Sequence, residues 1–258
     1  MAYNRLSRFT VNLSNLTIDP ASEYVMIQQF DRHDWHNGGS MFFGNDGFLY
    51  LTVGDEGRIQ DFYNSAQQLN KGLFSGILRI DVDQDPSKGH PIRRQPLSGS
   101  TPPTGWPGSF SQGYYIPNDN PWQSASGSLL EEFFAIGLRS PHRMDYDQVT
   151  GNIWVGDVGG GQREEISILG YGDNAQWPYR EGNLTTTKAK PYPLIGTDRP
   201  PVFEYDRSMG SCVIGGFVYR GNKYPSLQGK YIFGDHTVRK IWTLTYNSQT
   251  GIYEDDFL

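Results

Sequence analysis

The loop between residues 33 and 60 carries the side chains best suited to chemistry. His33 and His36 flank an Asp-Trp pair, and the following Asn-Gly-Gly (37–39) gives the backbone unusual freedom. A histidine in such a loop could act as a general base, because the imidazole pKa lies near neutrality. The alternative is a hydrogen-bonded turn histidine without a catalytic partner. The residue types alone leave both interpretations open.

Two further segments bring polar groups to the ends of apolar segments. In GDEGRIQ (54–60), Asp55 and Gln60 follow closely on an apolar run, where the simplest role of Asp55 is to accept turn N–H groups. Arg139, in GLRSPHR, stands between an apolar segment and a proline. Its planar guanidinium could clamp an anionic ligand or pair with a neighbouring carboxylate. Both interpretations stay open for Arg139.

The segment GDVGGGQREE (156–165) contains three consecutive glycines that allow the backbone to approach a ligand or an ion closely. It is not a P-loop, because no Gly-Lys-Ser/Thr follows. Exposed carbonyl oxygens in such a loop suit a hard cation such as Ca²⁺. Glu164 and Glu165 point to opposite faces of a strand, so this pair is not expected to form an acid–base dyad.

The elements that must position these groups read as short strands. Three runs of apolar and aromatic residues end in Gly-Asp: LYLTVGD (49–55), IWVGD (153–157) and YIFGD (231–235). Such residues suit a packed sheet. Turn sequences at 45–47 and 149–151 precede the first two runs and predict hairpins. The repetition predicts stacked or radially arranged β-sheets, and periodicity alone does not separate a propeller from a sandwich or a barrel.

The same repeats predict how the strands group. We expect the first repeat to end with GILRIDVD (76–83), the second to begin with EEFFAIGL (131–138) and the third with VFEYD (202–206). A Pro/Gly/Ser-rich insertion at about 84–127 is expected to contain no helix, because its prolines are incompatible with one. Residues 1–258 therefore read as a single β-domain or a fragment of one.

Composition excludes several classes of protein. With 31 Gly, 16 Pro and 14% aromatic residues, the chain fits many short strands joined by turns. The net charge of −6 argues against a nucleic-acid surface. No run of about 18 apolar residues occurs, so no membrane span is expected, and the strand-like first residues do not read as a signal peptide. The single cysteine, Cys212, excludes an intrachain disulfide.

Taken in chain order, these segments resemble the soluble PQQ-dependent aldose sugar dehydrogenases, the glucose/sorbosone dehydrogenase family. The matching motifs run from about His36 to Trp242 and include HNGG, FGNDGFLYLTVGDEG, AIGLRSPHR, GNIWVGDVG, WPYREG and GGFVYRG. The resemblance implies a six-bladed β-propeller holding pyrroloquinoline quinone (PQQ) on its axis with Ca²⁺. It implies oxidation of an aldose at the anomeric carbon to a lactone, with a quinone or cytochrome as electron acceptor. It also implies a periplasmic or extracellular location.

The resemblance assigns roles to individual residues. His36 matches the general base that takes the hydroxyl proton while hydride passes to the quinone, and Asp55 matches the acidic residue beside it. Arg139 matches the arginine on the quinone oxygens. The remaining implied contacts, to sugar, cofactor and calcium, fall on Gln60, Tyr219 and the main-chain carbonyls of Gly159 and Gly160.

Some features depart from the family pattern. Ser140 stands where Asn is usual, and no residue clearly replaces the cofactor-binding lysine of the soluble glucose enzymes. Only three clear blades plus flanking strands are visible, so we expect a six-bladed propeller fold that this chain represents in part. The main alternative is a non-catalytic binding module, because Hedgehog-interacting proteins resemble the same family and share HNGG and GGFVYRG. A calcium-dependent hydrolase propeller is a third interpretation, for which no cluster of Asp, Asn and Glu is obvious.

Overall fold

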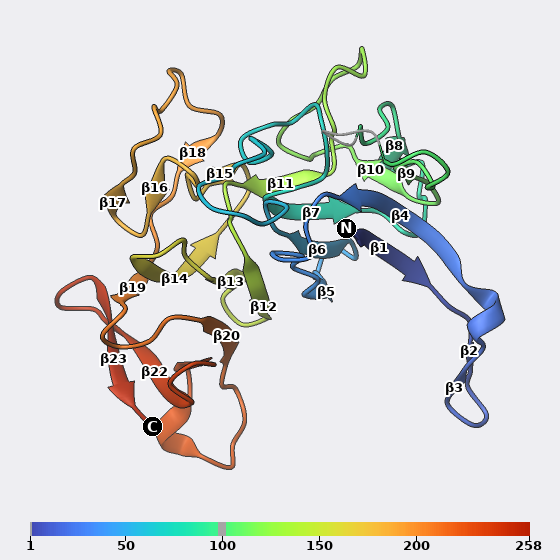
Figure 1. The fold of residues 1–258 in the computed structure, drawn as a ribbon. Coiled ribbons are helices and arrows are strands. Elements are labelled where there is room, and N and C mark those ends of the chain that lie inside the picture. Colours follow the sequence, from blue (N-terminus) through green and yellow to red (C-terminus); the bar gives the residue numbers. More distant parts are fainter. Residues whose placement is uncertain (1, 98–101) are drawn as a thin grey trace.

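The described part of the chain consists of β-strands joined by turns and loops. The computed structural model describes residues 2–97 and 102–258, and within these ranges the helices are two 3₁₀ turns, η1 (Pro20–Ser22) and η2 (Pro225–Leu227). Figure 1 shows four main sheets that follow one another in chain order along an open arc, from the blue N-terminal sheet to the red C-terminal one. We name these sheets blades I to IV.

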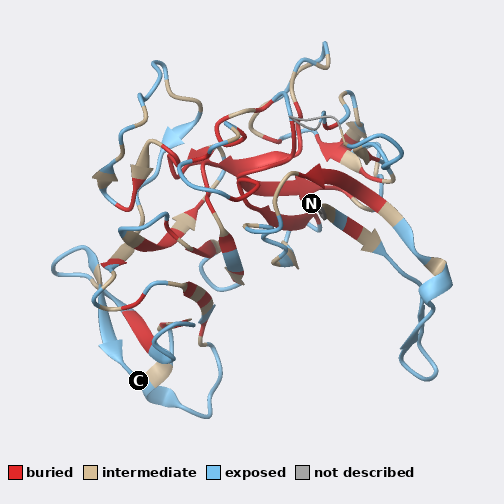
Figure 2. Cartoon of the chain, in the orientation of Figure 1, coloured by how far each residue is buried: buried red, intermediate tan, exposed pale blue. Residues whose placement is uncertain are grey.

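Blade I is an antiparallel sheet of three strands with β4 in its centre. A small hairpin, β2–β3, joins β1 to β4, projects away from the sheet and is exposed to solvent (Figures 1 and 2). The strands of blade I are β1 (Ala2–Arg8), β4 (Tyr24–Asp31) and β9 (Phe110–Ser111), and those of the hairpin are β2 (Val11–Asn12) and β3 (Thr17–Ile18).

Blade II is the largest sheet, with the strand order β18-β15-β11-β7-β6-β5. Its strands are β5 (Met41–Phe43), β6 (Leu49–Val53), β7 (Gly76–Ile80), β11 (Phe133–Ile136), β15 (Asp173–Asn174) and β18 (Thr197–Asp198). Two short hairpins lie outside the four blades: β8 (Gly89–Pro91) with β10 (Tyr115–Pro117), and β16 (Arg180–Glu181) with β17 (Leu184–Thr185).

Blades III and IV are four-stranded antiparallel sheets in which each strand pairs with the next strand of the same blade. Blade III contains β12 (Pro141–Asp147), β13 (Asn152–Asp157), β14 (Arg163–Leu169) and β19 (Phe203–Asp206). Blade IV contains β20 (Val213–Val218), β21 (Tyr231–Asp235), β22 (Lys240–Asn247) and β23 (Ile252–Phe257).

The hydrophobic core lies between consecutive blades. Leu6 and Ile27 of blade I pack in one cluster with Leu51 of blade II, and two further clusters join blade II to III and blade III to IV. Figure 2 shows this burial as red segments on the central strands of the sheets, such as β4 and β7. Each large apolar side chain buried in this way contributes about 1.5–3 kcal/mol. The apolar side chains on the face of one blade therefore pack against those of the next blade.

Blades III and IV approach each other closely at two glycines. A Cβ added to Gly156 would lie 2.6 Å from the Cα of Gly215, and Gly215 itself has a φ of +77°. A side chain at Gly156 would meet backbone, which has little freedom to move. At these two glycines the backbones of β20 and β13 therefore meet without a side chain between them.

Both predicted hairpins are confirmed, but the grouping of strands predicted from the repeats is wrong in two places. The turns at 45–47 and 149–151 connect β5 to β6 and β12 to β13. However, β11, expected to open the second repeat, pairs with β7 in blade II, and β19, expected to open the third, pairs with β14 in blade III. In each case the strand preceding a new inner strand completes the outer part of the previous blade, where an unpaired edge is available.

The Pro/Gly/Ser-rich stretch at 84–127 contains no helix in its described residues, as predicted. It is not structureless, since β9 pairs with β4 of blade I and β8 pairs with β10. Residues 98–101, in the middle of this stretch, lie outside the described residues. Part of the predicted insertion thus serves as the outer strand of blade I.

Candidate functional site

Asp55, two residues after the end of β6, is the centre of the candidate site. The residue is fully buried, and its Oδ1 lies 2.6 Å from Nδ1 of His36. Its Oδ2 accepts a hydrogen bond from the indole Nε1 of Trp177 at 2.7 Å, and its Oδ1 also accepts from the Gly57 N–H at 3.0 Å. The carboxylate therefore orients an imidazole while being oriented by an indole.

His36 is held in a tight loop that lies on the β6 strand. A Cβ on Gly54 would meet the His36 carbonyl oxygen at 1.8 Å, and one on Gly38 would meet the Thr52 carbonyl oxygen at 2.5 Å. These glycines let the HNGG loop lie directly on the strand end. The His36 side chain is 10% exposed. With Nδ1 engaged by a carboxylate, Nε2 is the nitrogen available to exchange a proton with a ligand.

Arg139 reaches the same place from the end of β11. Its carbonyl oxygen accepts a hydrogen bond from the Asp55 N–H at 2.9 Å, and its guanidinium carbon lies 5.5 Å from the centre of the Trp177 ring. Nη1 donates to the Val158 carbonyl at 2.8 Å, whereas Nε is buried without a hydrogen-bond partner. The structure thus brings His36, Asp55 and Arg139 together around one tryptophan.

The glycine loop after β13 borders this cluster. A Cβ on Gly160 would lie 3.0 Å from the Trp177 ring, and one on Gly159 would lie 1.6 Å from the Arg163 carbonyl oxygen. Oε1 of Glu181 accepts hydrogen bonds from three successive N–H groups, those of residues 161 to 163, at 2.6–2.9 Å. The loop is therefore compact, and it is fixed from outside by a carboxylate.

Asp157, at the end of β13, serves the backbone. Its two carboxylate oxygens accept the N–H groups of Arg139 and Ser140 at 2.9 and 2.6 Å. Burial raises its pKa, since these hydrogen bonds only partly compensate for the loss of water, and the nearby Asp55 charge adds to the rise. The pKa of Glu165, which faces Asp157 across the strand pair, is raised by burial in the same way.

Two predicted site residues are not brought into this cluster. Gln60 is exposed in the loop after Asp55 and has no side-chain hydrogen bond to any described residue. Tyr219 follows the end of β20 opposite to the Val213–Asp235 pair, and its hydroxyl accepts a hydrogen bond from the Tyr224 N–H. Tyr219 therefore lies at the blade IV end remote from its Gly-Asp turn. Roles for both residues stay predictions.

Gln60 nevertheless belongs to a strained loop. Four non-glycine residues between positions 56 and 61 have a positive φ, at Glu56, Arg58, Gln60 and Asp61. Such backbone conformations are costly and tend to cluster at functional sites. The strain is localised immediately beyond Asp55.

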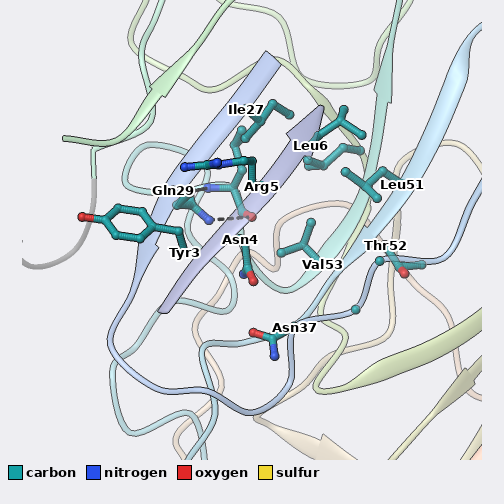
Figure 3. A pocket seen from close by; sticks show the side chains of 14 residues that line it. Tyr3, Asn4, Arg5, Leu6, Ile27, Gln29, Asn37, Leu51, Thr52 and Val53 are labelled. Atoms are coloured by element: carbon teal, nitrogen blue, oxygen red, sulfur yellow. Dashed lines mark hydrogen bonds between the residues drawn. The ribbon is translucent and has the colours of Figure 1, made fainter. Parts of the chain in front are cut away.

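Two hollows adjoin the site without including its central residues. A pocket of about 270 Å³ opens between β1 of blade I and β6 of blade II, beside Asn37 (Figure 3). A second, of about 460 Å³, is lined by the inner edges of blades II, III and IV, including Ser40, Arg143 and Gly216. Neither is lined by His36, Asp55 or Arg139. The candidate site is therefore identified by the contacts among its side chains and not by the size of a pocket.

Sequence reasoning missed the contacts of Trp177, Glu181 and Arg207. Trp177 stands in the WPYREG motif, which marks the resemblance but gives no hint of a bond to a carboxylate 122 positions earlier. Glu181 is the fifth residue of the same motif. Arg207 lies in a turn after a strand, where an isolated arginine gives no signal.

The comparison with protein families decides which family this is. The sequence profile described as "Glucose / Sorbosone dehydrogenase" matches residues 111–258. The chain belongs to the glucose/sorbosone dehydrogenase family. This confirms the resemblance found in the sequence motifs.

Curated relatives carry other names. The chain is 32% identical over 236 residues to the HIPL2 protein of Arabidopsis thaliana, covering 86% of the chain and 31% of that protein. It is 28% identical over 233 residues to the human (Homo sapiens) Hedgehog-interacting protein, covering 90% of the chain and 28% of that protein. The chain thus spans about a third of the length of the curated relatives it matches.

Solved structures of low sequence identity share the fold. The soluble aldose sugar dehydrogenase of Escherichia coli, in the apo-form, aligns with a TM-score of 0.69 at 20% identity, covering 98% of the chain and 62% of that protein. The PQQ-bound aldose sugar dehydrogenase of Streptomyces coelicolor aligns at 0.62 and 16%, covering 98% and 58%. The chain is a partial β-propeller, as predicted, with an arc of blades that does not close. Among the described residues, no helix has the length and apolarity to span a membrane.

Proposed function

We propose that this protein oxidises aldose sugars at the anomeric carbon to lactones, with PQQ as the immediate electron acceptor. The observation that carries the proposal is the His36–Asp55–Trp177 hydrogen-bonded series, in which a buried carboxylate orients an imidazole. Such an arrangement suits a general base, because the acid fixes the ring and favours its protonated form after proton transfer. Membership of the glucose/sorbosone dehydrogenase family supports the same chemistry.

The residues of this chain would divide the work as follows. Nε2 of His36 takes the proton of the anomeric hydroxyl, and Asp55 stabilises the resulting imidazolium. PQQ, when bound, supplies the acceptor for the hydride that leaves the anomeric carbon. Loss of one proton and one hydride converts a cyclic aldose to its lactone without any added oxygen.

Arg139 is suited to hold the quinone. Its buried Nε has no partner, and a buried donor of this kind is expected to have an acceptor, which a quinone oxygen would supply. Its guanidinium carbon lies 5.5 Å from the centre of the Trp177 ring, whose face attracts a cation. The calcium implied by the resemblance fits less well than PQQ does. The guanidinium of a different arginine, Arg207, already lies against the Gly159 carbonyl oxygen.

Further features of the proposal follow from the family. We expect a quinone or a cytochrome to accept the electrons from reduced PQQ, and a periplasmic or extracellular location. We also expect the whole of residues 1–258 to belong to one propeller domain. No nucleic-acid partner is expected, given the net charge of −6.

A second candidate function is a non-catalytic binding module. The names of the curated relatives favour it, since two of them in human and mouse are Hedgehog-interacting proteins at 28% identity. In that case the His36–Asp55 pair would be a structural remnant. Sugar-dependent turnover by the PQQ-loaded protein separates the two functions, because a binding module needs no catalytic step.

The test has two steps, PQQ binding followed by turnover. We expect PQQ added to the purified protein to bind saturably by absorbance, and the loaded protein to reduce an artificial dye with aldoses. His36→Ala should lower that rate by about 10²–10⁴-fold, the usual cost of losing a general base. His33→Ala is the matched control, since His33 lies on the same loop without touching Asp55. Saturable PQQ binding without dye reduction by any aldose would favour the binding module.

A further inference from the structure

Arg207, in the turn after β19, places its guanidinium inside the glycine loop. Nε donates to the Gly161 carbonyl oxygen at 3.0 Å, and Nη2 lies 3.5 Å from the Gly159 carbonyl oxygen. Nη1 is bonded to the carboxylate of Glu164, which is fully buried. One arginine thus contacts two carbonyls of the loop and a buried acid.

A second carboxylate faces the same guanidinium. Oε1 of Glu181 lies 3.9 Å from Nη2 of Arg207 while accepting the three loop N–H groups. Burial alone would raise the pKa of Glu181, but these N–H groups and the Arg207 charge together hold it below its ordinary value. The guanidinium therefore lies among two acids and two carbonyl oxygens.

These oxygens are of the type that binds a hard divalent cation. Ca²⁺ takes carboxylate and backbone carbonyl ligands, and the family resemblance implies that it binds at Gly159 and Gly160. Here the positive charge is already supplied by a side chain. A calcium ion on the Gly159 carbonyl would stand next to the guanidinium, and like charges repel strongly where little water screens them.

We propose that Arg207 is the resident cation of the glycine loop, and that this loop binds no calcium. The loop then keeps its shape and its charge balance in the presence of a chelator, and an anionic ligand that enters meets a guanidinium instead of a metal ion. The proposal is independent of sugar oxidation, because metal binding is measured without substrate or PQQ.

The decisive variant is Arg207→Ala, which removes the cation and leaves the oxygens in place. We expect calorimetric titration with CaCl₂ to show one more bound ion per chain in this variant than in the unmodified protein. Arg207→Lys keeps the positive charge and should show no extra ion. Arg163→Ala is the matched control, because it removes a neighbouring charge paired with Glu204 and leaves Arg207 in position. It should also show no extra ion.

Two results would overturn the proposal. One is a folded Arg207→Ala variant, judged by circular dichroism, that binds no additional ion. The other is calcium binding by the unmodified protein that disappears in Glu181→Gln, since that would place the ion at this loop. If Arg207→Ala does not fold, the comparison of the unmodified protein with Glu181→Gln decides. Equal calcium binding by these two proteins supports the proposal.

Discussion

Asp55 and Asp157 end the second strands of neighbouring blades in the same Gly-Asp pair, yet their carboxylates bind different partners. Asp157 accepts only backbone N–H groups, those of the two residues that lead into β12. Asp55 accepts one backbone N–H and uses its remaining capacity for the side chains of His36 and Trp177. The same local sequence therefore fixes the connection in one blade and orients a potential base in the other.

Blade IV shows which of the two uses is general. Asp235 accepts the N–H groups of Thr237 and Val238 within its own turn and that of Cys212 from the start of the blade, together with the Tyr205 hydroxyl. Accepting at least one backbone N–H group at this carboxylate is thus common to all three blades. Of these three carboxylates in the described part of the chain, only Asp55 also contacts a histidine, which the neighbouring HNGG loop provides. The Gly-Asp repeat therefore places the carboxylate, and the HNGG loop adds the potential base.

The largest effect is expected when the functional carboxylate is changed. In Asp55→Asn, the amide N–H₂ group faces Nδ1 of His36 and favours the tautomer that carries its proton on Nε2, which is no longer a base. We expect the dye-reduction rate to fall about 10²–10⁴-fold. Adding His36→Ala to this variant should change little, because the two residues act as one unit.

The rate measurement also tests the comparison itself. Retention of the unmodified rate by Asp55→Asn would mean that Asp55 has the same structural role as Asp157. The folded state of the variant is checked by its melting temperature before rates are compared.

A smaller, purely structural effect is expected for the other carboxylate. Asp157→Ala leaves two buried N–H groups without acceptors, at a cost of about 1–3 kcal/mol each. We expect the free energy of unfolding in urea to fall by about 2 kcal/mol or more. The control is Asp206→Ala, because Asp206 is exposed and accepts N–H from Ser208 in a surface turn. Equal stabilities of the two variants would contradict the role assigned to Asp157.

The smallest effect concerns pH and the strained loop beyond Asp55. Burial raises the pKa of Asp61 to about 7, although it accepts N–H groups from Ser65 and Ala66. Between its ordinary value near 3.8 and about 7, the folded state holds a proton that the unfolded state has lost, so stability falls as pH rises through this window.

Asp61→Asn removes that titration and keeps an oxygen for the two N–H groups. We therefore expect the unfolding free energy of the variant to decrease less between pH 5 and pH 7.5 than that of the unmodified protein. Asp31 and Glu132, whose pKa values are also raised by burial to about 7, keep part of the slope in both proteins. Parallel pH profiles would contradict the assignment.

The sequence predicted local structure better than strand partners. The Asn-Asp-Gly turn specifies a hairpin through its own conformational preferences, and that hairpin forms. The partner of β11 depends on which sheet edge is free when the chain arrives, and residues 131–138 carry no information on that. The prediction therefore failed at β11 and β19 for the same reason.

The candidate site follows a similar pattern. Residue types alone could not decide between a catalytic and a structural His36, and the motif resemblance was needed to pair it with Asp55. The Trp177 contact depends on two loops 122 positions apart meeting at one strand end. Arg207 was missed because its partners, Gly159 and Gly161, come together with it only through the β14–β19 pairing.

The contact between Gly156 and Gly215 has a geometric consequence for the molecule as a whole. Where backbone meets backbone, the separation of two adjoining sheets cannot adjust by a change of rotamer. A side chain at Gly156 would meet the backbone of Gly215 and would push blades III and IV apart at this point. Two residues that lack any side chain therefore help to set the spacing between these two sheets.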